Sequence, residues 1–320
     1  MQPLLEVKDL RTSFFTEAGE VRAVDGVSFA VEPGKLMGLV GESGSGKTAS
    51  VLSIMRLLPE RARVVGGAVL FEGRDLLSLS EPEMRAVRGA KIAMIFQEPM
   101  TSLNPVFTIG NQIGEAVRLH QHTARRETHA RTIEALRLVG IADPERRVND
   151  YPHQLSGGMR QRVMIAMALA CKPRLLIADE PTTALDVTIQ AQILDLIREL
   201  QVRLGLAVIL VTHDLGIVAQ YADDVTILYA ARVMEQAASA ELFRNPLNPY
   251  TRGLLESIPG VDGRHHRRLR AIAGTIPSAL HPPSGCRFHP RCPMAIDECA
   301  RVDPPLVSKA AQHLVACIRV

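Results

Sequence analysis

Apolar and polar residues alternate near the N-terminus, which is the pattern of strands that bury one face. The alternation runs through residues 5–31 and is repeated in VVGGAVLFEG at 64–73. The apolar members of the first stretch are Leu5, Val7, Val24, Val27, Phe29 and Val31. This region therefore predicts short antiparallel strands joined by turns.

A different pattern lies between these stretches, at residues 36–58 (LMGLVGESGSGKTASVLSIMRLL). An apolar run leads into a glycine-rich turn, and apolar residues then recur at helical spacing. This segment predicts a strand, a loop and a helix in succession.

Strand signals fade from residue 101 to about 162, where segments such as ARRETHARTIEALRLVG at 124–140 have apolar residues at helical spacing. Parallel-strand character returns in LLIADE at 175–180, LAVILVTHD at 206–214 and VTILY at 225–229. Between the first two, a helix is expected at 187–204. Its predicted buried stripe consists of Ile189, Ile193, Leu196, Ile197, Leu200 and Leu204.

These patterns predict an α/β domain at 1–235, with an N-terminal antiparallel β subdomain and an inserted helical subdomain at about 100–162. Residues 236–320 change composition to proline, histidine, arginine and cysteine and are expected to form a separate C-terminal extension. The basic run at 264–270 is expected to be a solvated loop.

Composition narrows the functional classes. The 320 residues are 47% hydrophobic, and 37 basic and 34 acidic residues give a net charge of +3, so no electrostatic footprint of a nucleic-acid-binding protein is visible. No apolar run approaches the roughly 20 residues of a membrane-spanning helix, and the first 15 residues lack a secretory signal pattern. We expect a cytoplasmic protein with no nucleic-acid partner.

Residues 41–48, GESGSGKT, match the phosphate-binding pattern G-x-x-x-x-G-K-[ST] between a predicted strand and helix. The glycines let backbone N–H groups and a helix N-terminus face phosphate oxygens. Lys47 is expected to reach the β and γ phosphates of ATP and Thr48 to bind Mg²⁺. The candidate nucleotide-binding residues are Gly41, Ser43, Gly44, Ser45, Gly46, Lys47 and Thr48.

An acidic pair, Asp179 and Glu180, ends the buried strand LLIADE. The carboxyl ends of parallel strands meet at one edge of a sheet, the edge that also carries the phosphate loop. Asp179 is expected to bind Mg²⁺ through water, and Glu180 is the candidate base for the attacking water.

Residues 155–162, LSGGMRQR, open a helical run, and Ser156, Gly157 and Gly158 form a second candidate anion site at a helix start. Here the sequence resembles the ABC (ATP-binding cassette) ATPase superfamily, whose signature is LSGGQ, with Met159 in the fifth place. The resemblance implies a P-loop ABC nucleotide-binding domain. It also implies a head-to-tail pair, in which this loop covers the γ phosphate held by the opposite subunit.

The resemblance assigns further residues in order along the chain. These are the Q-loop glutamine Gln97, which contacts Mg²⁺ and water, the D-loop residues Ala184, Leu185 and Asp186, and the switch histidine His213. Phe14 aligns with the aromatic residue that stacks on adenine, and Phe15 is the alternative.

Within the superfamily, residues 154–194 resemble the D-type ATPases of dipeptide and oligopeptide importers. NPLNPYTRGLLESIP, GTIP and GCRFHPRCP resemble the C-terminal extension of that group and of nickel-uptake ATPases. The resemblance implies a second, non-identical ATPase subunit, two membrane permeases and an extracytoplasmic peptide-binding protein. The chain would then lie on the cytoplasmic face of the bacterial cell membrane, and a nickel or other solute importer is the alternative.

Four of the five cysteines, Cys286, Cys292, Cys299 and Cys317, lie in the last 35 residues. Their spacing is neither that of paired zinc hairpins nor that of ferredoxins, but four thiolates suit an iron-sulfur cluster or zinc. Some D-type relatives carry a 4Fe-4S cluster on this set, so we predict that cluster, with zinc or free thiols as alternatives and His281 and His289 as weaker ligands. Cys171 is expected to be an inert buried thiol. Because we expect this tail to lie outside the nucleotide core, loss of the cluster should leave nucleotide binding largely intact.

Two other classes use similar motifs. A soluble ABC ATPase of DNA maintenance would carry long coiled coils or zinc insertions within its domain, and neither pattern is present here. A small-molecule kinase would have a phosphate loop but no use for a signature loop. The sequence favours the transporter over both.

Overall fold

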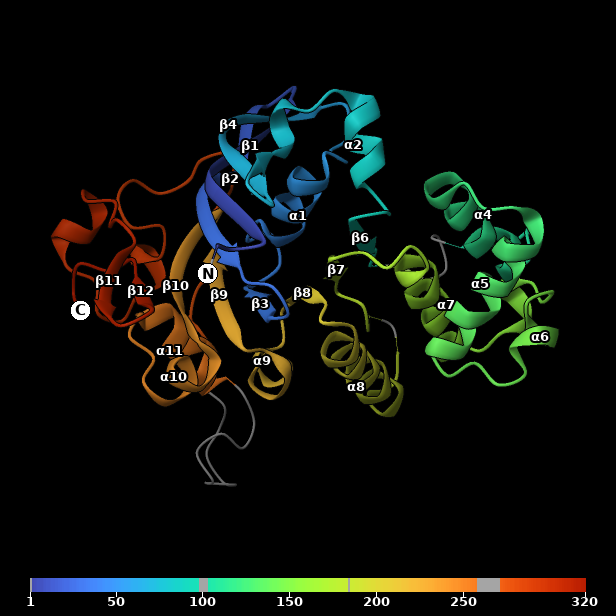
Figure 1. Ribbon diagram of the computed structural model, residues 1–320. Coiled ribbons are helices and arrows are strands. Elements are labelled where there is room, and N and C mark those ends of the chain that lie inside the picture. The colour runs from blue at the N-terminus through green and yellow to red at the C-terminus, as the bar shows by residue number, and fades with distance from the viewer. Residues whose placement is uncertain (1, 98–102, 184, 258–270) are drawn as a thin grey trace. The chain divides into compact units, whose positions relative to one another are not determined.

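The computed structural model describes residues 2–97, 103–183, 185–257 and 271–320 (Figure 1). They form two compact units, one of Met1–Leu77 with Leu210–Val320 and the other of Ser78–Ile209. Strand β8 (Ala207–Thr212) contains the boundary between them. Ala184 of the expected D-loop, the basic run 264–270 and residues 100–102 of the expected helical subdomain lie outside the described residues.

The first unit begins with an antiparallel sheet. Strand β1 (Leu5–Thr16) pairs with β2 (Gly19–Val31) and β4 (Ala62–Phe71), and β5 (Arg74–Asp75) completes the order β2-β1-β4-β5. The predicted antiparallel strands are confirmed, but β1 and β2 are 12 and 13 residues long rather than short. Register shifts interrupt the alternation along β1, which is why one long strand has the pattern of several short ones.

A second sheet of this unit positions the glycine-rich loop. Strand β3 (Leu36–Val40) is parallel to β9 (Asp224–Tyr229), and β9 is antiparallel to β10 (Arg232–Ala238). The C-terminal extension continues the sheet, because β12 (His313–Val315) pairs with β10, and β11 (Val307–Ala310) pairs with β12 (Figure 1). Within its described part, this unit has the α-helices α1 (Lys47–Met55), α9 (Leu215–Tyr221), α10 (Ser239–Arg244) and α11 (Pro249–Glu256).

The extension also shares a hydrophobic core with these strands. Phe288 lies in one cluster of buried residues with Val40 of β3 and Tyr229 of β9. Cys286 and Cys292 pack against the same cluster. The strand that leads into the glycine-rich loop is therefore packed in a core to which the extension contributes.

The second unit contains a parallel strand pair, β6 (Ile92–Ile95) and β7 (Leu175–Asp179). The predicted helical character of the segment before residue 162 is confirmed. The α-helices among the described residues of this unit are α2 (Glu81–Val87), α4 (Ile109–Gln121), α5 (Arg125–Leu138), α6 (Pro144–Arg147), α7 (Gly157–Leu169) and α8 (Val187–Leu204). Among the described residues, no helix is both long and apolar enough to span a bilayer.

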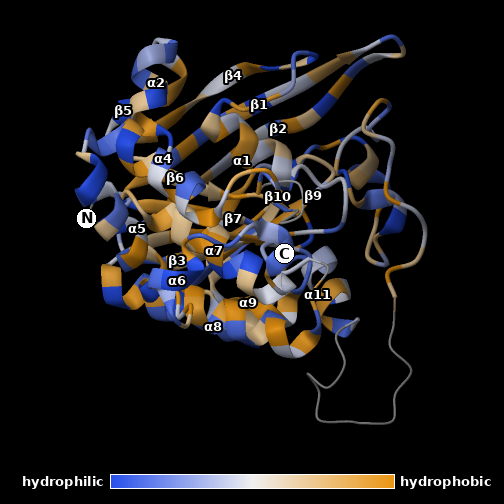
Figure 2. Ribbon diagram, turned by 90° about the vertical axis from the view of Figure 1, so that its right-hand side faces the viewer, coloured by the Kyte–Doolittle hydropathy of each residue, from blue (hydrophilic) through white to orange (hydrophobic). Residues whose placement is uncertain are grey.

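Helix α8 has the predicted bounds and an amphipathic pattern (Figure 2). Ile193, Leu196, Ile197 and Leu200 of the predicted stripe are buried, and Ile189 is half-buried. Leu204, however, is 45% exposed, so its predicted burial is wrong. It is the last helical residue before Gly205, whose left-handed conformation ends the helix.

Candidate nucleotide-binding site

The loop Gly41–Gly46 connects the fully buried strand β3 to helix α1. Gly44 and Gly46 have φ values of 76° and 100°, which residues with a side chain rarely adopt. A Cβ on Gly41 would lie 2.1 Å from the carbonyl oxygen of Leu228. The loop therefore has a conformation that only glycine permits at these positions, with the N-terminus of α1 directly after it.

Lys47 is the first residue of α1, and its side chain is almost fully buried. Its Nζ donates to the carbonyl oxygens of Gly41 at 2.7 Å and Glu42 at 3.1 Å. The ammonium group thus folds back over the start of the loop. Together with the N–H groups at the start of α1, it forms a positively polarised site suited to phosphate oxygens.

The far end of the loop is tied to the turn between β9 and β10. The N–H of Ala231 donates to the carbonyl oxygen of Ser45 at 3.0 Å, and the N–H of Asp25 donates to that of Ala231 at 2.9 Å. Within the described residues, the buried Oγ of Ser45 has no hydrogen-bond partner. A buried hydroxyl of this kind is suited to bind a ligand oxygen.

Glu42 is held by residues that the sequence patterns did not identify. Its N–H donates to the hydroxyl of Tyr250 at 3.2 Å, and both of its carboxylate oxygens accept from Arg291. Arg291 belongs to the C-terminal extension, one residue before Cys292. The expectation that the extension lies outside the nucleotide core is therefore wrong for this segment, because Arg291 contacts the phosphate loop directly.

In the second unit, Asp179 is the last residue of β7 and Glu180 follows it, while Gln97 lies two residues after the end of β6. The parallel register, with Ile95 opposite Ala178, brings these two strand ends together. The Gln97 amide donates to Glu180 Oε2 at 2.9 Å, and the Thr183 hydroxyl donates to the same oxygen at 3.2 Å. Glu180 has φ 44°, a strained conformation that is typical of functional sites.

The signature residues begin helix α7 as predicted. Ser156 is its N-cap, and its hydroxyl accepts from the N–H of Met159 at 3.3 Å. Ser156 and Gly157 are exposed, whereas a Cβ on Gly158 would lie 2.9 Å from Ile189 Cγ2 of α8. Asp186 caps α8 in the same way, accepting from the N–H of Ile189 at 3.0 Å. The two candidate residues thus cap two helices that contact each other.

The remaining candidate residues of the first unit are the switch histidine His213 and the adenine-stacking candidates Phe14 and Phe15. His213 follows β8 and is exposed. Phe14 is half-buried in β1, and the neighbouring Phe15 is 38% exposed with the guanidinium of Arg63 4.3 Å above its ring.

The four C-terminal cysteines line a single cavity. Cys286, Cys292, Cys299 and Cys317 surround it together with Phe288 and His289, and His281 is not among the lining residues. Burial raises the pKa of Cys286 to about 11 and also raises the pKa of Cys292, and the neighbouring thiols contribute in the same direction. Among the described residues, no group of three or more metal-binding side chains is arranged to hold a metal ion. The structure thus brings together the four cysteines that the sequence analysis singled out.

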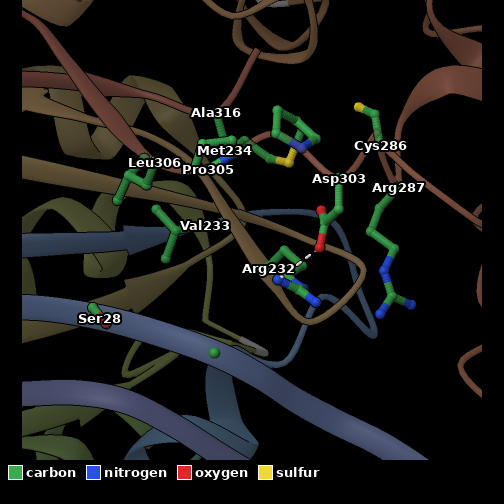
Figure 3. A pocket seen from close by; sticks show the side chains of 12 residues that line it. Ser28, Arg232, Val233, Met234, Cys286, Arg287, Asp303, Pro305, Leu306 and Ala316 are labelled. Carbon is green, nitrogen blue, oxygen red and sulfur yellow. Dashed lines mark ion pairs between the residues drawn. The ribbon is translucent and has the colours of Figure 1, made fainter. Parts of the chain in front are cut away.

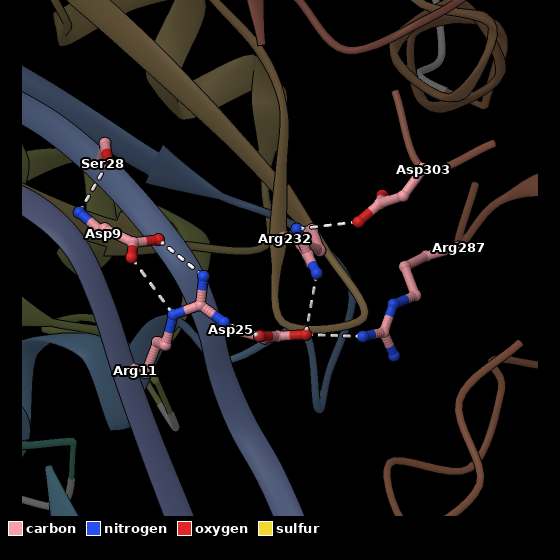
Figure 4. A network of polar contacts seen from close by, with 7 residues as sticks. All are labelled: Asp9, Arg11, Asp25, Ser28, Arg232, Arg287 and Asp303. Carbon is pink, nitrogen blue, oxygen red and sulfur yellow. Dashed lines mark hydrogen bonds and ion pairs between the residues drawn. The ribbon is translucent and has the colours of Figure 1, made fainter. Parts of the chain in front are cut away.

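A polar network holds the extension to the strands of the first unit (Figure 4). Buried Asp25 of β2 accepts from Arg11 at 3.3 Å, Arg232 at 3.0 Å and Arg287 at 2.6 Å. Burial lowers the pKa of Arg287, which stays paired with Asp25. An adjacent pocket of about 110 Å³ is lined by Arg232, Arg287 and Asp303 among others (Figure 3).

Comparisons with known proteins agree with this geometry. The family described as ABC transporter matches residues 24–183, and the family described as oligopeptide/dipeptide transporter, C-terminal region, matches residues 234–299. The probable peptide ABC transporter ATP-binding protein y4tR of Sinorhizobium fredii is 56% identical over 317 residues, which are 99% of this chain and 95% of that protein. The oligopeptide transport ATP-binding protein AppD of Bacillus subtilis is 49% identical over 318 residues, 99% of this chain and 97% of that protein.

Solved structures show the same fold. The ATP-binding cassette MJ0796, in a dimeric post-hydrolysis state bound to ADP and Pi, matches with a TM-score of 0.66 and 27% identity over 73% of this chain and 98% of that one. The cbiO1 protein of Clostridium perfringens, part of the cbiONQ transporter complex, matches with a TM-score of 0.65 and 27% identity. The match covers 77% of this chain and 92% of that one. The resemblance inferred from the sequence is confirmed. The chain therefore belongs to the ATP-binding subunits of ABC transporters, in the group with an oligopeptide/dipeptide transporter C-terminal region.

Proposed function

We propose that this chain binds and hydrolyses ATP to power the import of dipeptides or oligopeptides across the cytoplasmic membrane. The phosphate loop carries this proposal, because Gly44, Gly46 and the buried Lys47 form an anion site at the start of a helix. The peptide substrate is supported by y4tR and AppD, which match nearly the whole chain including the extension. A nickel or other solute importer with the same ATPase role is the alternative.

The proposed nucleotide contacts follow from the chemistry of each side chain. Lys47 binds the β and γ phosphates, Phe14 stacks on adenine, and Ser43 and Ser45 add polar contacts in the loop. Thr48, Asp179 and Gln97 would hold Mg²⁺ through oxygen ligands, which this ion prefers. Bound Mg²⁺ would neutralise charge on the phosphate oxygens.

The proposed hydrolytic residues are Glu180, Gln97 and His213. Glu180 takes the proton of the attacking water, and His213 contacts the γ phosphate. The hydrogen bond from the Gln97 amide to Glu180 supports this assignment, because it fixes the direction of the carboxylate. In this arrangement, Gln97 contacts both the base and the magnesium site.

The partners are proposed from the same family. Ser156, Gly157, Gly158 and Asp186 would act on the nucleotide of a second, non-identical cassette subunit, and the exposure of Ser156 and Gly157 supports a role outside their own chain. Two permeases and an extracytoplasmic peptide-binding protein would complete the transporter. The chain would then sit at the cytoplasmic face of the membrane. The exposed apolar side chains of Val106 and Phe107, 70% and 51% accessible, are suited to contact a permease.

Replacement of the proposed base tests the hydrolytic role. In the assembled transporter, Glu180→Gln should retain ATP binding but lower turnover by at least ~10²-fold, the usual effect of a positioned base. Glu199→Gln, an exposed substitution of the same kind on α8, serves as the control and should leave turnover unchanged. Near-normal hydrolysis by Glu180→Gln would show that the base is a different residue.

We also propose that Cys286, Cys292, Cys299 and Cys317 hold a 4Fe-4S cluster. The fact that all four line one cavity supports this proposal. Cysteine thiolates are the usual ligands of such clusters, and the cluster would lower the pKa values that burial now raises. Zinc and free thiols are the alternatives.

Anaerobic purification tests the cluster directly. We expect brown protein with about four iron and four sulfide per chain, and colourless protein after Cys292→Ser. Cys171→Ser is the matched control, since Cys171 lies outside the cavity, and it should retain the colour. Colourless wild-type protein with one zinc per chain would favour a zinc site, and metal-free protein would favour free thiols.

A further inference from the structure

The second residue of the phosphate loop, Glu42, is fixed at both its backbone and its side chain. Tyr250 accepts from its N–H, and the guanidinium of Arg291 binds both carboxylate oxygens, Nη1 to Oε2 at 2.8 Å and Nη2 to Oε1 at 3.1 Å. Paired N–H···O bonds of this kind fix direction as well as distance. Glu42 therefore has a defined orientation within a loop that otherwise consists mainly of glycine and serine.

Arg291 is itself held in place by the extension and the sheet. Its Nε donates to the carbonyl oxygen of Ala273 at 3.0 Å, and Nη1 donates to the hydroxyl of Tyr229 at 3.3 Å. Its side chain is 4% exposed, and the hydrogen bonds to Glu42 raise its pKa, so it is charged at every physiological pH. The guanidinium is thus a fixed positive charge beside the phosphate loop.

This charge matters because Glu42 lies where a polyphosphate is expected. The carbonyl oxygen of Glu42 accepts from Lys47 Nζ, the group that we assign to the β and γ phosphates. A free carboxylate beside the phosphates would repel them and compete for Lys47. Paired with Arg291, the carboxylate is held on the guanidinium and its charge is compensated.

We propose that Arg291 of the C-terminal extension is a positioning residue of the phosphate loop, which keeps Glu42 from opposing nucleotide binding. This inference rests on the proposed ATP-binding function. The segment 286–292 connects it to the cysteine cavity, because Cys286 and Cys292 line that cavity while Phe288 packs against Tyr229 and Tyr250. The extension thereby sets the nucleotide affinity of its own chain.

The test is a set of full-length variants whose MgATP affinity is measured by equilibrium titration with a fluorescent ATP analogue and competition with ATP. Arg291→Ala should weaken binding about tenfold, because it leaves the Glu42 carboxylate uncompensated. Adding Glu42→Gln to Arg291→Ala removes that charge and should recover at least about fivefold. Arg301→Ala, which removes a charge elsewhere in the extension, should bind as the wild type does.

Recovery by the second substitution separates positioning from a general loss of structure. If Arg291→Ala bound ATP like the wild type, or if Glu42→Gln restored nothing, the inference would be wrong. Thermal denaturation monitors folding. If Arg291→Ala does not fold, Arg291→Lys takes its place: it keeps the charge but loses the two parallel hydrogen bonds to Glu42, so it should bind MgATP with intermediate affinity. Wild-type protein that failed to bind MgATP would instead contradict the proposed function.

Discussion

At the scale of single residues, the phosphate loop depends on where a Cβ atom fits. Gly46 combines φ 100° with a position at which an added Cβ would lie 2.4 Å from the carbonyl oxygen of Ala23. Gly205 at the end of α8 also has a positive φ, 61°, but no heavy atom lies within 4 Å of its added Cβ. A comparison of alanine substitutions at the two glycines therefore separates the cost of backbone strain from the cost of steric overlap.

We expect Gly46→Ala to destabilise the protein more than Gly205→Ala. Left-handed backbone costs an alanine about 1–2 kcal/mol at either site. The overlap with Ala23 adds about 1–3 kcal/mol at Gly46 alone. Urea unfolding of both variants measures the difference, and equal losses would show that the loop moves freely to accept a side chain.

Single residues also show what sequence patterns overlook. Lys47 and Thr48 are recognisable because their spacing from the glycines is local, whereas Arg291 is 249 positions from Glu42. An isolated arginine in a proline-rich tail has no distinguishing pattern. A bidentate partner can be identified only after folding has brought the two residues together.

At the scale of elements, helices α7 and α8 begin at the residues that the sequence assigns to function. Ser156 and Asp186 are N-caps, and each side chain satisfies a backbone N–H that the helix leaves unpaired. Each residue therefore has a structural role in addition to its proposed contact with the nucleotide of a second subunit.

Substitution of Asp186 distinguishes the two roles. Asp186→Ala removes the cap and should cost about 1 kcal/mol of stability, whereas Asp186→Asn keeps an acceptor oxygen and should cost only a few tenths. If the charge of Asp186 also serves hydrolysis, Asp186→Asn should slow turnover of the assembled transporter without lowering its melting temperature. Equal destabilisation by both variants would contradict the capping role.

Element bounds were predictable where the signals lie within the element. The apolar stripe, Asp186 and Gly205 together define α8, and its bounds match the prediction. The lengths of β1 and β2 exceed those of the predicted short strands, since their register shifts depend on pairing with other strands. The exposure of Leu204 in the last turn of α8 likewise depends on which elements pack beside it, and a helical period does not describe those elements.

At the scale of the whole molecule, the proposed ATP site is shared between two cassettes. In that proposed arrangement, the phosphate loop of one subunit would gain its remaining donors from the signature loop of the other, so an isolated chain should hydrolyse ATP slowly. Assembly with a second cassette and two permeases should then raise the rate.

Ser156→Arg tests this sharing. It should damage hydrolysis at the partner's ATP site while this chain's own phosphate loop binds nucleotide nearly normally, because the altered residue acts across the interface. Nucleotide trapping in the reconstituted complex, with each signature loop changed in turn, assigns the loss to one site. Loss of ATP binding by the variant chain itself, or full activity of the isolated wild-type chain, would rule out a shared site.

The sequence by itself determined the fold class, the phosphate loop, the signature loop and helix α8, since each depends on glycine positions or hydrophobic period over a few neighbouring residues. Only the tertiary structure decided which distant groups meet. It paired Gln97 with Glu180 across 83 positions and gathered four cysteines around one cavity. It also placed Arg291 on the phosphate loop. These contacts follow from strand order and core packing, which join segments with no local pattern in common.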